Sequence, residues 1–232
     1  MTGPAPGPAL RVVSYNVHGL RDDRAALAEV VRDLDPDVLI VQEAPRRLRW
    51  RTRNAHLAHD LGLVYATGGA PTLGNVILTG LRVRTLSAWA LRFPLTPGRH
   101  LRGAAFARCR VGRTDVVVVG SHLATDPVER PDQARRLAKA LAELDAPVVL
   151  GVDLNEPPGG SAWEHLAQTV TDPAAADPAA TPSFPAAGPV HRLDAVLVGP
   201  GIAVTSYRVG TGPAACRASD HLPVVADLTL PT

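Results

Sequence analysis

Five apolar, strand-like runs stand next to polar side chains that can carry chemistry, and this pattern constrains the fold more than any other. Four runs end in such groups and a fifth begins just after them: Asn16, Glu43, Ser121-His122, Asp153-Leu154-Asn155 and, before the alternating stretch 223–230, Asp220-His221. Runs of about four to eight apolar residues are typical of strands buried in a sheet. Ligands and catalytic groups collect just beyond the ends of such strands. We therefore expect one shared site, and this points to an enzyme.

The length and composition predict one globular domain. The chain has 232 residues, of which 46% are hydrophobic and 20% are charged, as is ordinary for a protein with a single core. We expect a short tail over 1–9 and one domain over 10–232. No stretch approaches the roughly 18 apolar residues of a transmembrane segment, and 1–9 lacks the basic and apolar regions of a signal peptide. A monomer in the cytoplasm is the expected state.

The chain is only mildly basic, but its arginines cluster locally. The net charge of +2 does not by itself indicate a nucleic-acid partner. Five arginines surround Trp50 in the stretch 46–53, directly after Glu43. Guanidinium groups bind phosphate, and an aromatic ring can stack on a base or sugar. The alternative interpretation is a solvated arginine face of a helix that Trp50 anchors to the core.

Hydrophobic periodicity predicts a mixture of helices and strands. Asp22 or Asp23 can cap a helix over 24–34, and further helices are expected over 48–61, from Pro131 and from Ser161, where Glu164 completes a capping-box pattern. Strands are expected near 11–16, 37–42, 74–79, 102–111, 115–121, 147–152, 193–198, 201–209 and 223–230. The Pro- and Ala-rich segment 171–190 is typical of a long loop. The mixture predicts an α/β or α+β fold.

The polar residues at the strand ends are mostly hard oxygen ligands. Carboxylates and amides of this kind are preferred by Mg²⁺, and Mn²⁺ is possible as well. Zinc is disfavoured, because the two cysteines, Cys109 and Cys216, are not in a metal-type spacing and the histidines do not form a zinc helix motif. A magnesium ion near Glu43 would polarise a phosphoryl oxygen, and a histidine with a buried carboxylate partner would be oriented and kept basic.

Five short motifs carry a resemblance to a known family. They are Tyr15-Asn16-Val17-His18-Gly19, Gln42-Glu43, Gly151-Val152-Asp153-Leu154-Asn155, His191-Arg192-Leu193-Asp194 and Ser219-Asp220-His221-Leu222-Pro223-Val224. In this order the chain resembles the endonuclease/exonuclease/phosphatase (DNase I-like) superfamily over about residues 10 to 230. That superfamily includes DNase I-like nucleases, abasic-site endonucleases, sphingomyelinases and inositol polyphosphate 5-phosphatases. Each motif alone is weak, but five in order at compatible spacing are specific.

The resemblance implies a metal side and a water side of the site. Glu43 resembles the principal metal carboxylate, with Asn16 supporting it and Asp220 as a second metal-side ligand. Asp153 resembles the acid that positions or deprotonates the attacking water, and Asn155 its partner, oriented toward the phosphate.

The resemblance also implies groups that contact the phosphate. His221 resembles the imidazole at the scissile phosphate, Asp194 the carboxylate that orients it, and His122 a second histidine aimed at the phosphate. Arg102, before Gly103, resembles a basic residue of several phosphatase branches, and Asn75 is a softer match; both are expected to bind substrate. The other histidines are interpreted as structural or surface residues: His18, His56, His59, His100, His165 and His191.

The resemblance, and not periodicity, selects the topology. It implies a four-layer α/β sandwich in which two mixed β-sheets pack face to face with helices outside. Periodicity alone does not distinguish this from a doubly wound sheet. The family usually has Gly-Asp-Phe-Asn where this chain has Val152 to Asn155, so we expect altered packing behind Asp153 and unchanged chemistry.

The resulting hypothesis is a magnesium-dependent phosphohydrolase that cleaves phosphate esters by in-line attack of water. The arginine stretch favours a phosphodiesterase or nuclease acting on nucleic acid. The alternatives are a phosphomonoesterase or a phospholipid or inositol-phosphate hydrolase of the same superfamily, which Arg102 and His122 support. A protein of another class, a non-catalytic module that binds a phosphate ligand, would keep the fold without turnover.

Overall fold

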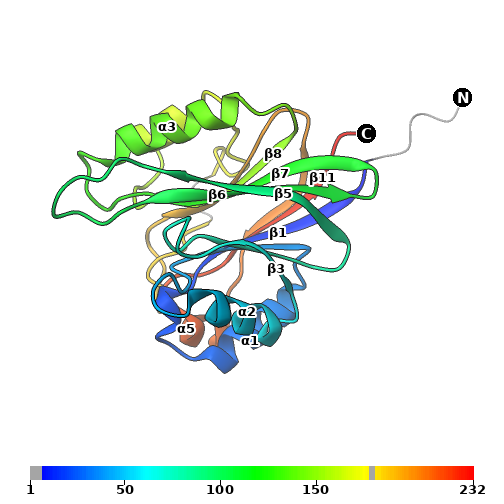
Figure 1. Ribbon diagram of the computed structural model, residues 1–232, viewed down its shortest axis with the longest axis vertical. Coiled ribbons are helices and arrows are strands. Elements are labelled where there is room, and N and C mark those ends of the chain that lie inside the picture. Colours follow the sequence, from blue (N-terminus) through cyan, green and yellow to red (C-terminus); the bar gives the residue numbers. More distant parts are fainter. Residues whose placement is uncertain (1–6, 178–180) are drawn as a thin grey trace, which may run out of the picture.

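The computed structural model describes residues 7–177 and 181–232, and within these ranges eleven strands form two mixed β-sheets (Figure 1). The six-stranded sheet has the order β10-β11-β1-β2-β4-β3, with strands β10 (Ala203–Val209), β11 (Val224–Thr229), β1 (Ala9–Asn16), β2 (Val38–Gln42), β4 (Val76–Thr79) and β3 (Val64–Gly68). The five-stranded sheet has the order β5-β6-β7-β8-β9, with strands β5 (Val83–Arg92), β6 (Gly103–Val111), β7 (Thr114–His122), β8 (Val148–Asp153) and β9 (Asp194–Val198). Of the tail expected over 1–9, residues 1–6 lie outside the described ranges.

Helices cover the outer face of each sheet. Helices α1 (Arg24–Leu34), α2 (Trp50–Asp60) and α5 (Pro213–Ala218) pack on the six-stranded sheet, and α3 (Arg130–Ala142) and α4 (Ser161–Leu166) on the five-stranded one. Figure 1 shows α3 on one side of the two sheets and α1, α2 and α5 on the other. A short 3-10 helix, η1 (His18–Leu20), follows β1. The predicted four-layer α/β sandwich is therefore confirmed.

The two sheets meet in an apolar layer that comes very close behind the polar strand ends. Ile40 of β2 and Ile77 of β4 face Gly120 of β7 and Gly151 of β8. A Cβ added at either glycine would lie 2.7 Å from a carbon of Ile40, which is closer than carbon atoms pack in protein interiors. The glycines thus let β7 and β8 approach the other sheet just before their last residues.

Strand pairing explains why polar residues distant in sequence reach the same end of the molecule. β1 and β2 are parallel, with Asn16 opposite Gln42, and β7 and β8 are parallel, with His122 opposite Asp153. β9 is antiparallel to β8, so that Asp194, its first residue, lies opposite Asp153. Because parallel strands end at the same edge and an antiparallel neighbour begins there, one edge collects the predicted site residues.

Two helix starts test the predicted caps. At α1, the Asp23 Oδ1 accepts hydrogen bonds from the N–H groups of Ala25 and Ala26 at 2.9 and 3.0 Å, as expected for an N-cap aspartate. The capping box predicted for Ser161 and Glu164 is wrong, because Gly160 is the N-cap residue of α4 and makes no side-chain cap.

Besides the short η1, three elements were not expected from the sequence. β3 lies at the edge of its sheet, and β5, also at an edge, exposes most of its residues, so neither has a clear buried face. α5 is only six residues long, too short for a helical period to stand out. None of the helices in 7–177 and 181–232 is long and apolar enough to cross a membrane.

Candidate active site

Asp153 forms the buried centre of the site. It is the last residue of β8 and is 1% exposed. The Asn16 side-chain amide donates to its Oδ2 at 2.9 Å, and the backbone N–H of Asn155 donates to its Oδ1 at 2.9 Å. Burial raises the pKa of Asp153, partly opposed by the neighbouring His122. The carboxylate therefore accepts a proton more readily than an exposed aspartate does.

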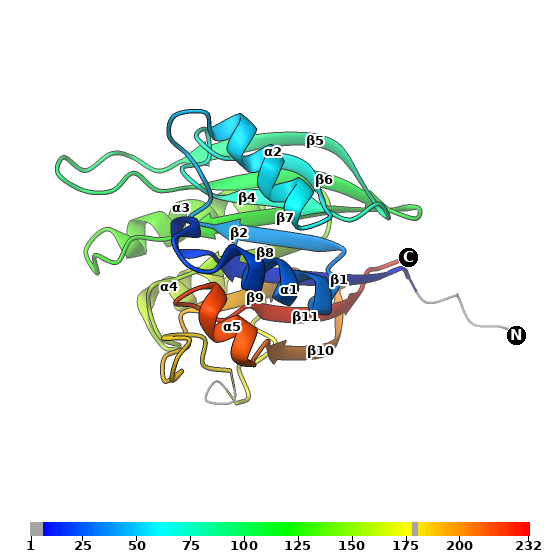
Figure 2. The same ribbon diagram turned by 90° about the horizontal axis from the view of Figure 1, so that it is seen from below.

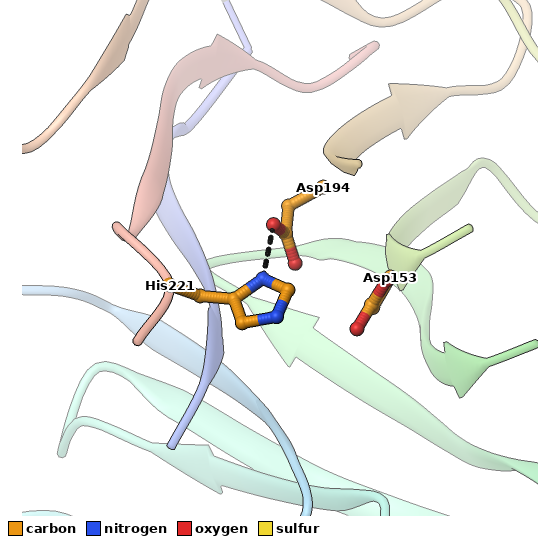
Figure 3. Close-up of side chains that lie close together, drawn as sticks. All are labelled: Asp153, Asp194 and His221. Atoms are coloured by element: carbon orange, nitrogen blue, oxygen red, sulfur yellow. Dashed lines mark hydrogen bonds and ion pairs between the residues drawn. The ribbon is translucent and has the colours of Figure 1, made fainter. Parts of the chain in front are cut away.

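Asp194 and His221 form a hydrogen-bonded pair beside Asp153 (Figure 3). The His221 Nδ1 lies 2.7 Å from the Asp194 Oδ2, and Figure 3 shows the other ring nitrogen on the side of Asp153. Burial, the largest effect, would lower the pKa of His221. The charge and hydrogen bond of Asp194, together with Asp153 and Asp220, outweigh it and raise the pKa to about 9. His221 is thus a cation at neutral pH, aimed into the site.

His122 is a second imidazole with the opposite electrostatics. The Arg102 guanidinium lies 3.1 Å from its Nδ1, and a guanidinium can only donate, so Nδ1 accepts. The proton of the neutral ring is then on Nε2, which lies 3.2 Å from the Asp153 Oδ2. Burial, reinforced by Arg102, lowers the pKa of His122 to about 3. His122 is therefore a neutral hydrogen-bond donor.

Asn155 lies against His122 in a backbone conformation that side chains rarely adopt. Its φ is 51°, in the left-handed region, which asparagine tolerates better than most residues. Its side-chain amide donates to the Leu123 carbonyl at 3.0 Å, and the amide nitrogen lies against the His122 Nε2 at 2.8 Å, a contact between two N–H groups and not a hydrogen bond. The strand ends of β7 and β8 are thereby joined through side chains as well as through the sheet.

The expected metal side opens into a cleft of about 570 Å³. Its charged and imidazole-bearing walls come from acids, arginines and histidines: Glu43, Asp220, Arg21, Arg46, Arg47, Arg53, Arg102, His18, His100 and His122. Glu43 follows β2 with a φ of 57°, and the Asp220 side chain is 40% exposed. Asn16 keeps an oxygen lone pair beyond the hydrogen bond that it accepts from the His18 N–H at 3.0 Å. These hard oxygen groups fit Mg²⁺ or Mn²⁺.

His18 and His100 were interpreted as structural or surface residues, but both line the cleft. The His18 Nδ1 lies 2.7 Å from Asp22, and its Nε2 lies 3.8 Å from the Asp220 Oδ2. A signal for His18 was available, since it stands two residues after Asn16 in a matched motif.

The arginine stretch 46–53 combines both interpretations. Arg46, Arg47 and Arg53 line the cleft. Trp50 is held structurally, because a Cβ on Gly69 would lie 2.3 Å from its ring and the Arg51 guanidinium lies 4.4 Å above that ring. Three of the five arginines therefore face the site, whereas the tryptophan anchors α2.

The two residues expected to bind substrate occupy different positions. Arg102 lies in the cleft wall beside His122, burial lowers its pKa, and its Nε has no hydrogen-bond partner among the described residues. Asn75 is 1% exposed, and its amide donates to the carbonyls of Thr72 and Gly103 at 2.8 and 2.9 Å. Asn75 thus holds the start of β6, directly after Arg102.

The loop expected over 171–190 supplies support for the Asp194–His221 pair. The Ser183 hydroxyl donates to the Asp194 Oδ2 at 2.7 Å, and the Phe184 ring lies 4.8 Å from the His221 ring, between centroids. Nothing in the sequence around these residues indicates this role, because a serine and a phenylalanine in a Pro- and Ala-rich segment match no motif. Residues 178–180 of this loop lie outside the described ranges.

Comparison with known proteins identifies the family. The model of the endonuclease/exonuclease/phosphatase family matches residues 13–221. The chain belongs to this family. No curated protein is detectably similar in sequence. Family membership agrees with the site at the strand ends and makes a phosphoric ester hydrolase the coarse functional class.

Solved structures with the same fold include other members of the family. A Bacteroides thetaiotaomicron family protein matches with a TM-score of 0.77 at 17% identity, over 98% of this chain and 100% of that one. A Beutenbergia cavernae endonuclease/exonuclease/phosphatase matches with a TM-score of 0.74 at 25% identity, over 96% of this chain and 72% of that one. D. rerio TDP2 in complex with a single-strand DNA product matches with a TM-score of 0.72 at 18% identity, over 95% of this chain and 98% of that one.

Proposed function

We propose that the chain is a divalent-metal-dependent phosphodiesterase of the nuclease type that acts on nucleic acid. The observation that carries the proposal is the buried group of Asp153, Asp194 and His221, each of which places a side-chain oxygen or nitrogen within 4.8 Å of the others, beside an arginine-lined cleft. Magnesium dependence, a monomeric state and a cytoplasmic location are parts of the same proposal.

Each residue of the group has a distinct task. Asp153, with its raised pKa, takes a proton from the attacking water, and Asn16 and His122 fix its orientation. The protonated His221, oriented by Asp194, donates to a phosphoryl oxygen and stabilises the charge that builds up there. Asn155, whose side chain lies against the His122 ring, offers an uncharged amide N–H to the same phosphate.

Glu43, Asn16 and Asp220 would hold the metal. Bound there, Mg²⁺ would supply positive charge that stabilises the charge developing on the phosphate.

The charges around the cleft favour a nucleic acid as the substrate. Five arginines line it against two carboxylates, Glu43 and Asp220, which the metal would neutralise. A chain of phosphates would pair with several of these guanidinium groups at once. The TDP2 complex with single-strand DNA shows that a protein with this fold holds such a product.

The test is hydrolysis by the purified protein after removal of metal and again with added Mg²⁺. The panel is bis-p-nitrophenyl phosphate, p-nitrophenyl phosphate, plasmid DNA and an inositol phosphate, with Asp153→Ala as the control. Magnesium-dependent cleavage of the diester or the plasmid, lost in the variant, is the expected result. Activity on the diester without metal would contradict the metal dependence.

A phosphomonoesterase is the second candidate, and Arg102 favours it. Its partly buried guanidinium, with Nε unpaired among the described residues, could meet the extra charge of a terminal phosphate. Cleavage of monoesters alone would select this function. Silence on the whole panel, with tight binding of a phosphate ligand, would select a non-catalytic binding module.

A further inference from the structure

A buried arginine joins the two loops that follow His122 and Asn155. Arg130 is the first residue of α3, and its side chain is 8% exposed. Its Nε donates to the Ala124 carbonyl at 2.8 Å and a terminal nitrogen donates to the Thr125 carbonyl at 2.6 Å. The other terminal nitrogen donates to the Glu156 Oε1 at 2.9 Å. One guanidinium therefore holds the loop after β7 and the loop after β8 together.

The partners of Arg130 are themselves held in place. The second oxygen of Glu156 accepts from the Ala162 N–H at 2.7 Å, at the start of α4. The Ala124 N–H donates to the Gln133 side chain, one turn into α3, at 2.8 Å. Both the N–H and the carbonyl of Ala124 are thus bound by side chains of α3, and the two oxygens of Glu156 are bound by Arg130 and by the start of α4.

These contacts begin where the sheet stops. The last pair in the register of β7 and β8 is His122 with Asp153, and beyond it the Leu123 N–H still donates to the Asp153 carbonyl at 2.9 Å. Ala124 lies two residues after His122, and Glu156 directly follows Asn155. The position of the Asn155 amide relative to the His122 ring, 2.8 Å from its Nε2, therefore depends on the loops that Arg130 ties together.

A purely stabilising role does not explain why an ion pair, Arg130 with Glu156, joins the two loops. Removing a charged pair from water costs desolvation energy, and well-packed apolar groups at such positions are often as stable. What the guanidinium provides is geometry, because its planar fork can fix three acceptors at once, whereas a lysine ammonium is a single flexible charge.

We infer that Arg130, with Glu156, is a positioning residue that sets the distance between His122 and Asn155 for catalysis. The catalytic part of this inference rests on the proposed function. Arg130 itself does not contact the substrate; it acts through the two loops. Misplacing reacting groups by about 1 Å can cost about 100-fold in rate.

The test compares Arg130→Lys with Arg11→Lys. Arg11 is the matched control, because it also joins a carboxylate (Asp227, 2.6 Å) and a carbonyl (Leu34, 3.1 Å) but lies near the start of β1, away from the site. For bis-p-nitrophenyl phosphate, Arg130→Lys should lower kcat at least about tenfold with KM within about twofold. Arg11→Lys should keep kcat near wild type. Equal kcat values in the two variants, at equal thermal stability, would overturn the inference.

A second readout does not depend on turnover. The ¹⁵N shifts of the His122 ring, measured by NMR at fixed pH in metal-free protein, should change in Arg130→Lys and stay constant in Arg11→Lys. If the wild type cleaves nothing, the proposed function fails, but a changed ring signal still supports the tie. An unchanged ring signal overturns it. If Arg130→Lys does not fold, Glu156→Gln replaces it in both experiments. The glutamine amide keeps only one of the two oxygens that accept from Arg130 and Ala162. For the inference to stand, this variant must show the same changes in kcat and in the ¹⁵N shifts of the His122 ring.

Discussion

The Asp194–His221 pair allows one prediction to be worked through in detail. Asp194→Asn keeps the shape of the side chain and removes its charge. In the wild type the pKa of His221 is raised from 6.5 to about 9, which at about 1.4 kcal/mol per tenfold change corresponds to roughly 3 kcal/mol in favour of the imidazolium. Without the Asp194 charge, burial remains and opposes protonation. We therefore expect the pKa of His221 to fall by at least about two units, to near or below its ordinary value.

The fraction of protonated His221 sets the expected loss of activity. With a pKa of about 6.5 in the variant and about 9 in the wild type, the loss of imidazolium should lower kcat about fourfold at pH 7 and about 30-fold at pH 8. The Asp194 Oδ1 has no partner among the described residues, so that the new amide N–H₂ would occupy this position while its oxygen still accepts from His221. Geometry should therefore be largely preserved.

The assay follows the His221 ring nitrogens by ¹H–¹⁵N NMR over a pH series in metal-free protein, together with kcat on bis-p-nitrophenyl phosphate with Mg²⁺. Asp115→Asn is the control, because Asp115 pairs with Arg110 at 2.6 Å near the start of β7, away from the site. It should change neither quantity. A His221 pKa that stays near 9 in Asp194→Asn, or a wild-type kcat in a folded variant, would refute the reasoning.

Three further predictions concern the metal side, the support of Asp194 and the neutral imidazole. Glu43→Ala should lower kcat at least about 100-fold, consistent with a loss of ~3 kcal/mol of transition-state stabilisation. The measurement is the hydrolysis rate over a Mg²⁺ titration, with circular dichroism to show that the variant folds. Wild-type rates in the folded variant would contradict the prediction. Ser183→Ala removes the 2.7 Å hydrogen bond to Asp194 and should reduce the free energy of unfolding in urea by about 1–2 kcal/mol, with a smaller loss of kcat than Asp194→Asn. Because the pKa of His122 is lowered to about 3 in the folded protein, the unfolded chain binds more protons below about pH 6.5 and stability should decrease as the pH falls from there. In His122→Asn the free energy of unfolding should decrease less steeply as the pH falls. If urea titrations between about pH 7 and pH 5 gave the same slope of this free energy against pH for the wild type and the variant, a neutral buried ring would be contradicted.

Local chemistry marks the candidate site residues in the sequence alone. Asp153 and Asn155 follow a continuous apolar run, and Asp194 and His221 lie in motifs whose order matched a family. Ser183 could not be recognised in this way. It acts on Asp194 through a loop, and the antiparallel bridge between Phe184 and His191 that holds this loop is a tertiary contact.

Edge elements were hidden for a related reason. β5 is exposed along most of its length, and an edge strand with two partly solvated faces has no alternation to detect. The arginines of 46–53 could equally have faced solvent or the site, because composition does not say where a loop turns. The tertiary structure decides between the two: Arg46 and Arg47 line the cleft, and Arg46 donates to the Leu73 carbonyl at 3.1 Å.

From the sequence alone follow the buried apolar strands, the chemical types of the groups at their ends and, through the order of five motifs, the family. These are properties of short segments, where period and residue type act locally. The tertiary structure decided which of those groups touch. Strand register places Asp194 beside Asp153. Burial lowers the pKa of His122, whereas the contact with Asp194 outweighs burial and raises the pKa of His221. Arg130 reaches Glu156, 26 residues further along the sequence, and so joins the loops that follow β7 and β8. Such properties depend on distances and on exclusion of water, which exist only once the two sheets have packed.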